Sequence, residues 1–267
     1  VDFTVTKQWN SVPEAAYDWH VTVGLYRTTE EVTDYTNLAY DDAHMVKGEN
    51  GQQLTVELYG PDHLTATFED LDKYCMEEEG TPEYTYYVKE LTVGGDEIDG
   101  TGFTKVVDGE KIDFTVDYTY AETGDAATVV NRVEGSLQVK KVWHDKGGES
   151  VLPEEITVGL YRIENGNPVE AKNPNDPDTH YTLILNKDSN WEGTFENLPE
   201  YYSGGNGDRG EKIQYAVYEL ENGTQIEQGG TLTATDGGSY TVYYVGAEIH
   251  NVREKALTIA KTVTGGA

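Results

Sequence analysis

Six polar residues stand where β-strand alternation predicts that their side chains point into an apolar interior. Successive residues of a strand point to opposite faces, so Lys7 shares a face with Val5 and Trp9 in the opening segment. In the second half of the chain, the same alternation places Lys141 inward and its neighbour Lys140 outward. Each half contributes a lysine, a glutamate and an asparagine, which are Lys7, Glu90 and Asn131, then Lys141, Glu219 and Asn251.

These three residue types can react with one another when they are held together away from water. Burial disfavours the charged forms of lysine and glutamate, which favours a neutral, nucleophilic amine and a protonated carboxyl group. The carboxyl group can polarise the asparagine carbonyl and carry protons from the amine to departing ammonia. Well-oriented groups reach effective molarities on the order of 10⁵ M or more, so a spontaneous lysine–asparagine amide bond is feasible.

The same residues also fit an interpretation without chemistry. A buried lysine–glutamate ion pair, with the asparagine as a hydrogen-bond partner, would satisfy the same polar groups. The residue pattern alone leaves both interpretations open. In either case the three groups must find partners, because burying a charge or an amide without one costs several kcal/mol.

An internal repeat underlies this duplication. The segment VTVGLYR at 21–27 returns as ITVGLYR at 156–162, and further matches follow in the same order in both halves. We therefore expect two copies of one fold, residues 1–134 and 135–254. Residues 255–267 are either a tail or the first strand of a further module.

Apolar and polar residues alternate with a period of two through much of the chain, for example in Ile112–Tyr120 and Thr241–Asn251. Gly, Asn, Pro and Asp mark loops between these segments, including residues 165–179 and 203–210. The 20 tyrosines favour strands, as do many valines and threonines. Many short strands separated by turns predict an all-β fold of two tandem β-sandwiches.

Composition excludes several classes of function. The net charge is −30, from 49 acidic and 19 basic residues, so neither nucleic acid nor insertion into a membrane is expected. The single cysteine, Cys75, excludes an intrachain disulfide. Neither a metal nor a cofactor is expected, because the histidines lack ligand spacing and no phosphate loop or catalytic triad is found. Without a signal peptide or a wall-sorting tail, the chain is expected to be a segment of a longer protein.

The chain resembles the collagen-adhesin B-type (Cna B-type) domains of Gram-positive surface proteins and pilins. The second half carries the resemblance in KVW, ITVGLYR, NWEGTFENLPEY, KIQYAVYE and EIHN, and the first half in KQW, VTVGLYR, TFEDL, YYVKE and VVN. The resemblance implies an immunoglobulin-like β-sandwich closed by a spontaneous Lys–Asn isopeptide bond. It implies that the lysines and asparagines form the cross-links and the glutamates promote them, at Lys7, Asn131 and Glu90, then at Lys141, Asn251 and Glu219. The first half departs from the second in having Leu64 where the second has Trp191.

The expected function is that of a structural stalk module in a cell-wall-anchored adhesin or pilus. The expected location is the extracellular cell surface or cell wall, and the expected partners are neighbouring domains of the same surface protein. Each glutamate would act once within its own domain, so the chain is not expected to be an enzyme. The alternative is an adhesin module that binds host extracellular matrix or glycan through loops, above all the extended stretch Thr28–Gln53.

Overall fold

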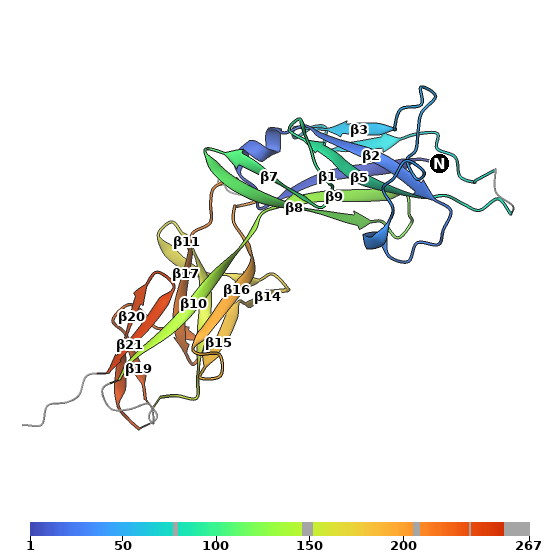
Figure 1. The fold of residues 1–267 in the computed structure, drawn as a ribbon. Helices are drawn as coiled ribbons and strands as arrows, with labels where there is room; N and C mark the ends of the chain where they lie inside the picture. Colours follow the sequence, from blue (N-terminus) through green and yellow to red (C-terminus); the bar gives the residue numbers. More distant parts are fainter. Residues whose placement is uncertain (77–79, 146–151, 205–208, 235, 254–267) are drawn as a thin grey trace, which may run out of the picture. The chain divides into compact units, whose positions relative to one another are not determined.

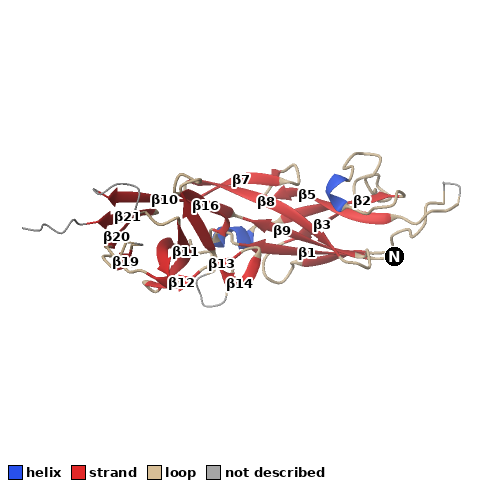
Figure 2. Ribbon diagram, turned by 90° about the horizontal axis from the view of Figure 1, so that it is seen from below, coloured by secondary structure: helices blue, strands red, loops and turns tan. Residues whose placement is uncertain are grey.

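Strands dominate the described chain. The computed structural model describes residues 1–76, 80–145, 152–204, 209–234 and 236–253 (Figure 1). Across these residues the helical elements are short 3₁₀ segments, drawn in blue in Figure 2, η1 (Glu14–Asp18) and η2 (Tyr35–Asn37). The all-β class predicted from the alternation is confirmed.

The chain divides into two compact units. The first comprises Val1–Glu134 together with Pro199–Lys212, and the second comprises Gly135–Leu198 and Ile213–Ala267. The division expected from the repeat left residues 199–212 in the second domain, whereas the structure groups them with the first unit. The expected tail or further strand at 255–267 lies outside the described residues.

A buried tyrosine explains this grouping. The ring of Tyr201 belongs to the apolar core of the first unit and is 7% exposed. Its backbone N–H donates a hydrogen bond of 3.0 Å to the hydroxyl of Ser11. A tyrosine buries a large apolar area, so this side chain helps to hold its segment against the first unit, as does the ion pair of Arg209 with Glu14.

Two sheets make up the first unit and lie as two layers in Figure 1, with the orders β4-β1-β9-β8-β7 and β3-β2-β5-β6. The first sheet contains β1 (Phe3–Asn10), β4 (Thr65–Phe68), β7 (Gly102–Val107), β8 (Glu110–Tyr120) and β9 (Ala126–Arg132). The second contains β2 (Val21–Thr28), β3 (Thr55–Leu58), β5 (Thr85–Val93) and β6 (Asp96–Glu97).

The second unit repeats this arrangement, with the sheet orders β16-β10-β21-β20-β19 and β12-β11-β17-β18, and with β15 also paired to β11. Its first sheet contains β10 (Glu134–Asp145), β16 (Glu192–Pro199), β19 (Thr231–Thr233), β20 (Ser239–Val245) and β21 (Glu248–Arg253). The second contains β11 (Glu155–Glu164), β12 (Asn167–Glu170), β15 (Thr182–Asn186), β17 (Tyr215–Glu221) and β18 (Thr224–Gln225). A separate hairpin is formed by β13 (Lys172–Asn173) and β14 (Asp176–His180).

The strands that carry the buried polar residues correspond between the two units. β10 occupies the place of β1, β17 that of β5 and β21 that of β9. In each unit the first strand pairs with the last strand, and the two run parallel. Side chains from both sheets of a unit form one apolar core, including Val5, Val23, Val88 and Val129 in the first, and Val139, Leu160, Phe195, Val217 and Ile249 in the second. The fold is therefore a tandem of two β-sandwiches, as the repeat predicted.

Two predicted segments differ from the structure. Thr241–Asn251 is not one strand, because Val245 pairs with Glu248 and the residues between them turn the chain from β20 into β21. Gly246 has a φ of 60° at this turn, a conformation that glycine adopts without a steric penalty.

The second difference lies in residues 165–179, which were predicted to be a loop and contain β12, β13 and most of β14. Asn165 and Gly166 have φ values of 52° and 78°, the pair of left-handed conformations that a tight hairpin turn requires. This turn folds β12 back onto β11, with Glu164 opposite Asn167.

The core assignment predicts a large effect for Phe195→Ala. The side chain of Phe195 is 0% exposed, so its loss should lower the free energy of unfolding of the second unit by about 3–5 kcal/mol. Ile184→Ala is the matched control, because Ile184 lies on β15 of the same unit with 57% of its surface exposed. It should change stability by less than about 0.5 kcal/mol in the same urea denaturation experiment. Similar losses for the two variants would contradict the packing described.

Candidate functional site

Lys7 and Asn131 enter the interior of the first unit from neighbouring strands. In the parallel pairing of β1 and β9, Lys7 lies opposite Val129 and Trp9 lies opposite Asn131. The lysine and the asparagine are thus offset by two residues and point to the same face of the sheet. Glu90 reaches them from β5 in the facing sheet. Lys7 is 1% exposed, and Glu90 and Asn131 are 0% exposed.

The carboxyl group of Glu90 connects the amine to the carboxamide. Its Oε1 lies 3.5 Å from Nζ of Lys7 and accepts a hydrogen bond of 3.1 Å from Nδ2 of Asn131. The amine also donates to the backbone carbonyl oxygens of Gln8 at 3.0 Å and Val129 at 3.4 Å. The three side chains predicted to act together therefore form one cluster.

The second unit contains the same cluster in the same register. Lys141 lies opposite Ile249, and Trp143 lies opposite Asn251. Nζ of Lys141 is 2.7 Å from Oε2 of Glu219, and Nδ2 of Asn251 donates to Oε1 of that carboxyl group at 3.3 Å. These three side chains are also buried. All six predicted residues are thus brought together in two sets of three.

Burial dominates the ionisation of the clusters. Loss of water lowers the pKa of Lys7 from 10.5 to about 8, against the opposing attraction of Glu90. The same cause lowers the pKa of Lys141 to about 8, against Glu219. Burial also raises the pKa of Glu90, more than Lys7 and Asn131 lower it. Moving a proton from the amine to the carboxylate of the first unit is therefore much less unfavourable than in water.

Several buried atoms of the clusters lack hydrogen-bond partners among the described residues: Oε2 of Glu90 and the amide oxygens Oδ1 of Asn131 and Asn251. An unsatisfied buried acceptor costs about 1–3 kcal/mol, and a plain ion pair would leave that cost uncompensated. A protonated glutamic acid would donate to the amide oxygen once the carboxamide turns about its Cβ–Cγ bond. That arrangement satisfies the acceptor and polarises the amide carbon.

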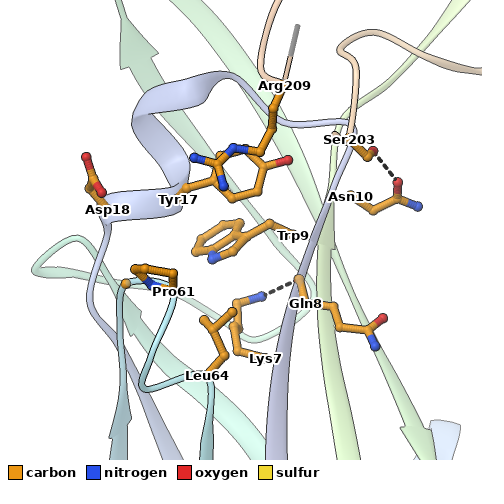
Figure 3. Close-up of a pocket in the computed structure, with 11 residues that line it drawn as sticks. Lys7, Gln8, Trp9, Asn10, Tyr17, Asp18, Pro61, Leu64, Ser203 and Arg209 are labelled. Atoms are coloured by element: carbon orange, nitrogen blue, oxygen red, sulfur yellow. Dashed lines mark hydrogen bonds between the residues drawn. The ribbon is translucent and has the colours of Figure 1, made fainter. Parts of the chain in front are cut away.

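An aromatic ring covers each lysine. Nζ of Lys7 lies 4.2 Å from the ring centre of Trp9, and Nζ of Lys141 lies 4.5 Å from that of Trp143. A hollow of about 570 Å³ lies beside Lys7. Figure 3 shows the side chains that line it, with the amine of Lys7 pointing to the backbone carbonyl of Gln8. Leu64 lines this hollow, and its backbone oxygen accepts from the N–H of Lys7 at 2.7 Å.

The second unit has a corresponding hollow beside Lys141. Its volume is about 790 Å³, and Trp191 occupies the place of Leu64, with its backbone oxygen 2.8 Å from the N–H of Lys141. The two tryptophans of this unit meet edge to face with ring centres 5.2 Å apart. Leucine in the first unit and tryptophan in the second therefore line the hollow beside the lysine differently, but both accept the same backbone hydrogen bond from it.

Two tyrosines contact the clusters and were missed by the sequence reasoning. Tyr118 and Tyr244 accept hydrogen bonds from the backbone N–H groups of Glu90 and Glu219. Each continues the inward alternation of the strand before the last, as in Val116 and Tyr118, and this signal could have been noticed. In the described part of the chain, no group of three or more metal-binding side chains is found. No helix among the described residues has the length and apolar character that a membrane crossing requires.

Part of this chain is similar in sequence to known proteins. Residues 137–243 match the family model of the Cna protein B-type domain. The collagen adhesin of Staphylococcus aureus is 30% identical over 135 residues, which are 50% of this chain and 9% of the relative. The chain therefore corresponds to a small part of the length of that relative.

Solved structures were also compared. A single B repeat unit of the collagen-binding surface protein of Staphylococcus aureus is 20% identical, with coverage of 96% of this chain and 99% of the other and a TM-score of 0.31. The minor pilin of Streptococcus agalactiae is 14% identical, with coverage of 97% and 100% and a TM-score of 0.27.

The family match falls on the unit in which Lys141, Glu219 and Asn251 meet, and the first unit repeats its strand order and its cluster. The chain therefore contains a region that is similar to the Cna protein B-type domain.

Proposed function

We propose that each unit forms an intramolecular isopeptide bond, Lys7 to Asn131 and Lys141 to Asn251, and that the cross-linked pair serves as a structural stalk module. The observation that carries this proposal is the duplicated cluster, in which a buried carboxyl group bridges an amine and a carboxamide at the same strand register. Both units keep the same three residue types buried at matching positions, although their sequences differ elsewhere.

The reaction begins with transfer of a proton from the lysine ammonium to the glutamate. The neutral Nζ attacks Cγ of the asparagine, and a new C–N bond forms. The protonated carboxyl group donates a hydrogen bond to the oxygen that develops negative charge. The glutamate then takes a proton from the attacking nitrogen and delivers one to the leaving nitrogen, so the old C–N bond breaks and ammonia departs. No oxidation or reduction is involved. Because neutral ammonia departs, the glutamate ends the reaction with the one proton that the lysine ammonium gave it in the first step.

The bond has a mechanical consequence. It joins the first strand of a unit to the last strand, and the two strands run parallel. The chain therefore enters the first strand at one end of the pair and leaves the last strand at the other end. Tension on the two termini of a unit pulls the strands past each other in shear. A covalent link across the pair carries that load in place of the hydrogen bonds.

We place the module at the surface of a Gram-positive cell, within a longer cell-wall-anchored adhesin or pilus, with neighbouring domains of that protein as partners. This placement is supported by the family match and by the relative named collagen adhesin. The glutamates act once within their own unit, so the chain has no turnover and is not an enzyme in the usual sense.

A second candidate function is ligand binding through Thr28–Gln53. A hollow of about 330 Å³ in this stretch is lined by Thr28, Asp34 and His44 among others. The stretch is also held down, since the hydroxyl of Tyr87 donates to the carbonyl of Ala39 at 2.5 Å. Excising it should abolish adhesion to matrix protein or glycan if this function is correct, and should leave the stalk function unchanged.

The difference between Lys141 and its neighbour Lys140 gives the sharpest test of the cross-link in the second unit. Lys141→Ala should reduce the mass deficit of the chain from two ammonia molecules to one, because the attacking amine is removed. Lys140→Ala is the matched control, since Lys140 is the adjacent residue and pairs with Glu192 on the surface. It should keep the full deficit in intact-mass measurement. A deficit that is equal in the two variants would exclude Lys141 as the nucleophile.

The rate of bond formation should have a bell-shaped dependence on pH. Between the two pKa values, the lysine and the glutamate share one exchangeable proton. It lies on the lysine in the ion pair and on the glutamate in the reactive form, so both forms have the same pH dependence. Above the Lys7 pKa of about 8 the pair loses this proton, so the rate should fall about tenfold per pH unit. Below the raised pKa of Glu90 the pair gains a second proton, and the rate should fall again.

This profile can be measured on chain kept in denaturant before the bond forms. The chain is refolded by dilution at a series of pH values, and aliquots quenched in acid are weighed by mass spectrometry. A rate that stays level well above pH 8 would show that the amine alone suffices. The acid role of the glutamate would then be wrong.

Loss of the bond should lower stability strongly. A cross-link that closes a loop of about 100 residues stabilises by about 4–5 kcal/mol in the chain-entropy estimate. Asn251→Ala should therefore lower the free energy of unfolding of the second unit by about this amount and make the unit sensitive to trypsin. Asn167→Ala, at an exposed position of the same unit, should do neither. Unchanged unfolding of Asn251→Ala would contradict a structural role for the bond.

A further inference from the structure

The glutamate strand has an open edge at the reaction centre. β5 pairs with β2 along one side, whereas on the other side β6 pairs only with Thr92 and Val93 among the described residues. The backbone N–H groups of Val88 and Glu90 point to this open side. A buried N–H group needs an acceptor, so some other part of the fold must supply it.

Tyrosine hydroxyls from the facing sheet supply the acceptors. The N–H of Glu90 donates to the hydroxyl of Tyr118 at 2.9 Å, and this hydroxyl donates onward to the carbonyl of Gly100 at 2.8 Å. Two residues along β8, the hydroxyl of Tyr120 accepts from the N–H of Val88 at 3.3 Å. Burial raises the pKa of both tyrosines, so the hydroxyls keep their protons.

The second unit uses the same device. The N–H of Glu219 donates to the hydroxyl of Tyr244 at 3.2 Å, and this hydroxyl donates to the carbonyl of Ile226 at 2.6 Å. β17 is paired with β11 over its length and with β18 only at its end, so its edge is open at Glu219 as well. Two units that differ in sequence thus retain one tyrosine contact at the same backbone atom.

Each tyrosine also has a fixed relation to the reacting asparagine. Tyr118 lies opposite Val129 in the pairing of β8 with β9, and Asn131 follows two residues later. Tyr244 lies opposite Ile249, and Asn251 again follows two residues later. The hydroxyl therefore ties the backbone of the glutamate to the strand beside the asparagine, across the gap between the two sheets.

We propose that Tyr118 and Tyr244 are positioning residues for isopeptide bond formation. Each fixes the glutamate strand of its unit relative to the facing sheet, so that the carboxyl group contacts both the amine and the carboxamide. This inference rests on the proposed cross-linking function. The tyrosines touch no reacting atom and act through the backbone of the glutamate. Sheets that pack only through apolar side chains can slide by fractions of an ångström, and proton transfer between groups at hydrogen-bond distance is sensitive to such shifts.

The test compares Tyr118→Phe with Tyr120→Phe in the full chain. Both remove one hydroxyl from β8 that caps the edge of β5, but only the first contacts the glutamate. After refolding from denaturant, intact mass and peptide mapping give the rate of each bond. Tyr118→Phe should slow the Lys7–Asn131 bond about tenfold, the effect of losing roughly one hydrogen bond, and should leave its final yield high. Tyr120→Phe should leave the rate within about twofold of the unmodified chain.

The other unit of each molecule is an internal control. Tyr118→Phe should leave the Lys141–Asn251 rate unchanged, and Tyr244→Phe should slow that bond alone. Thermal unfolding of both β8 variants in an Asn131→Ala background, where no bond can form in the first unit, measures the purely structural cost of each hydroxyl. A lower rate for Tyr118→Phe than for Tyr120→Phe at similar structural cost supports positioning.

Two outcomes would overturn the inference in distinguishable ways. If the unmodified chain forms its bonds and Tyr118→Phe forms them at the same rate, or if Tyr120→Phe is slowed equally, the tyrosines only stabilise the sandwich. If the unmodified chain shows no loss of ammonia, the proposed function fails and the inference fails with it.

Discussion

The cost of removing an ammonium and a carboxylate from water is the constraint on which both clusters depend. A lysine and a glutamate buried between two sheets cannot keep full charges cheaply, and their mutual attraction only partly offsets the loss of hydration. In the first unit this loss brings the two pKa values towards each other. The same desolvation that makes the unreacted cluster unfavourable makes its neutral, reactive form accessible. In the proposed reaction, conversion to an amide and free ammonia would remove the buried charges and with them the cost of their lost hydration.

The sandwich brings the three side chains of each cluster together. Lysine and asparagine reach the cluster from one sheet, on the parallel pair β1 and β9, while the glutamate reaches it from the other. The three groups therefore meet only when both sheets have docked, so the proposed reaction would require the folded sandwich. Tyr118 adds a polar tie between the sheets where apolar packing alone leaves freedom to slide. Under the proposed function, folding would come first and bond formation second, which would protect against a cross-link between wrongly paired strands.

Much of this arrangement follows from local sequence. Period-two alternation placed Lys7, Lys141 and their four partners inward because a strand has only two faces, and the structure buries all six. The sequence repeat predicted two copies of one fold, and each copy has an apolar core of its own. Other features depend on contacts far apart in sequence. The place of Tyr201 in the first core, the turn at Gly246 within an alternating run, and the open edge of β5 that Tyr118 caps all require knowledge of which strands are neighbours.

The most direct test of the central claim is the intact mass of the folded, unmodified chain, followed by sequencing of its cross-linked peptides. The account predicts a mass lower than that of the sequence by two ammonia molecules, with one branched peptide joining Lys7 to Asn131 and another joining Lys141 to Asn251. An unmodified mass in fully folded protein would contradict it, and the two clusters would then be buried ion pairs with hydrogen-bonded asparagines.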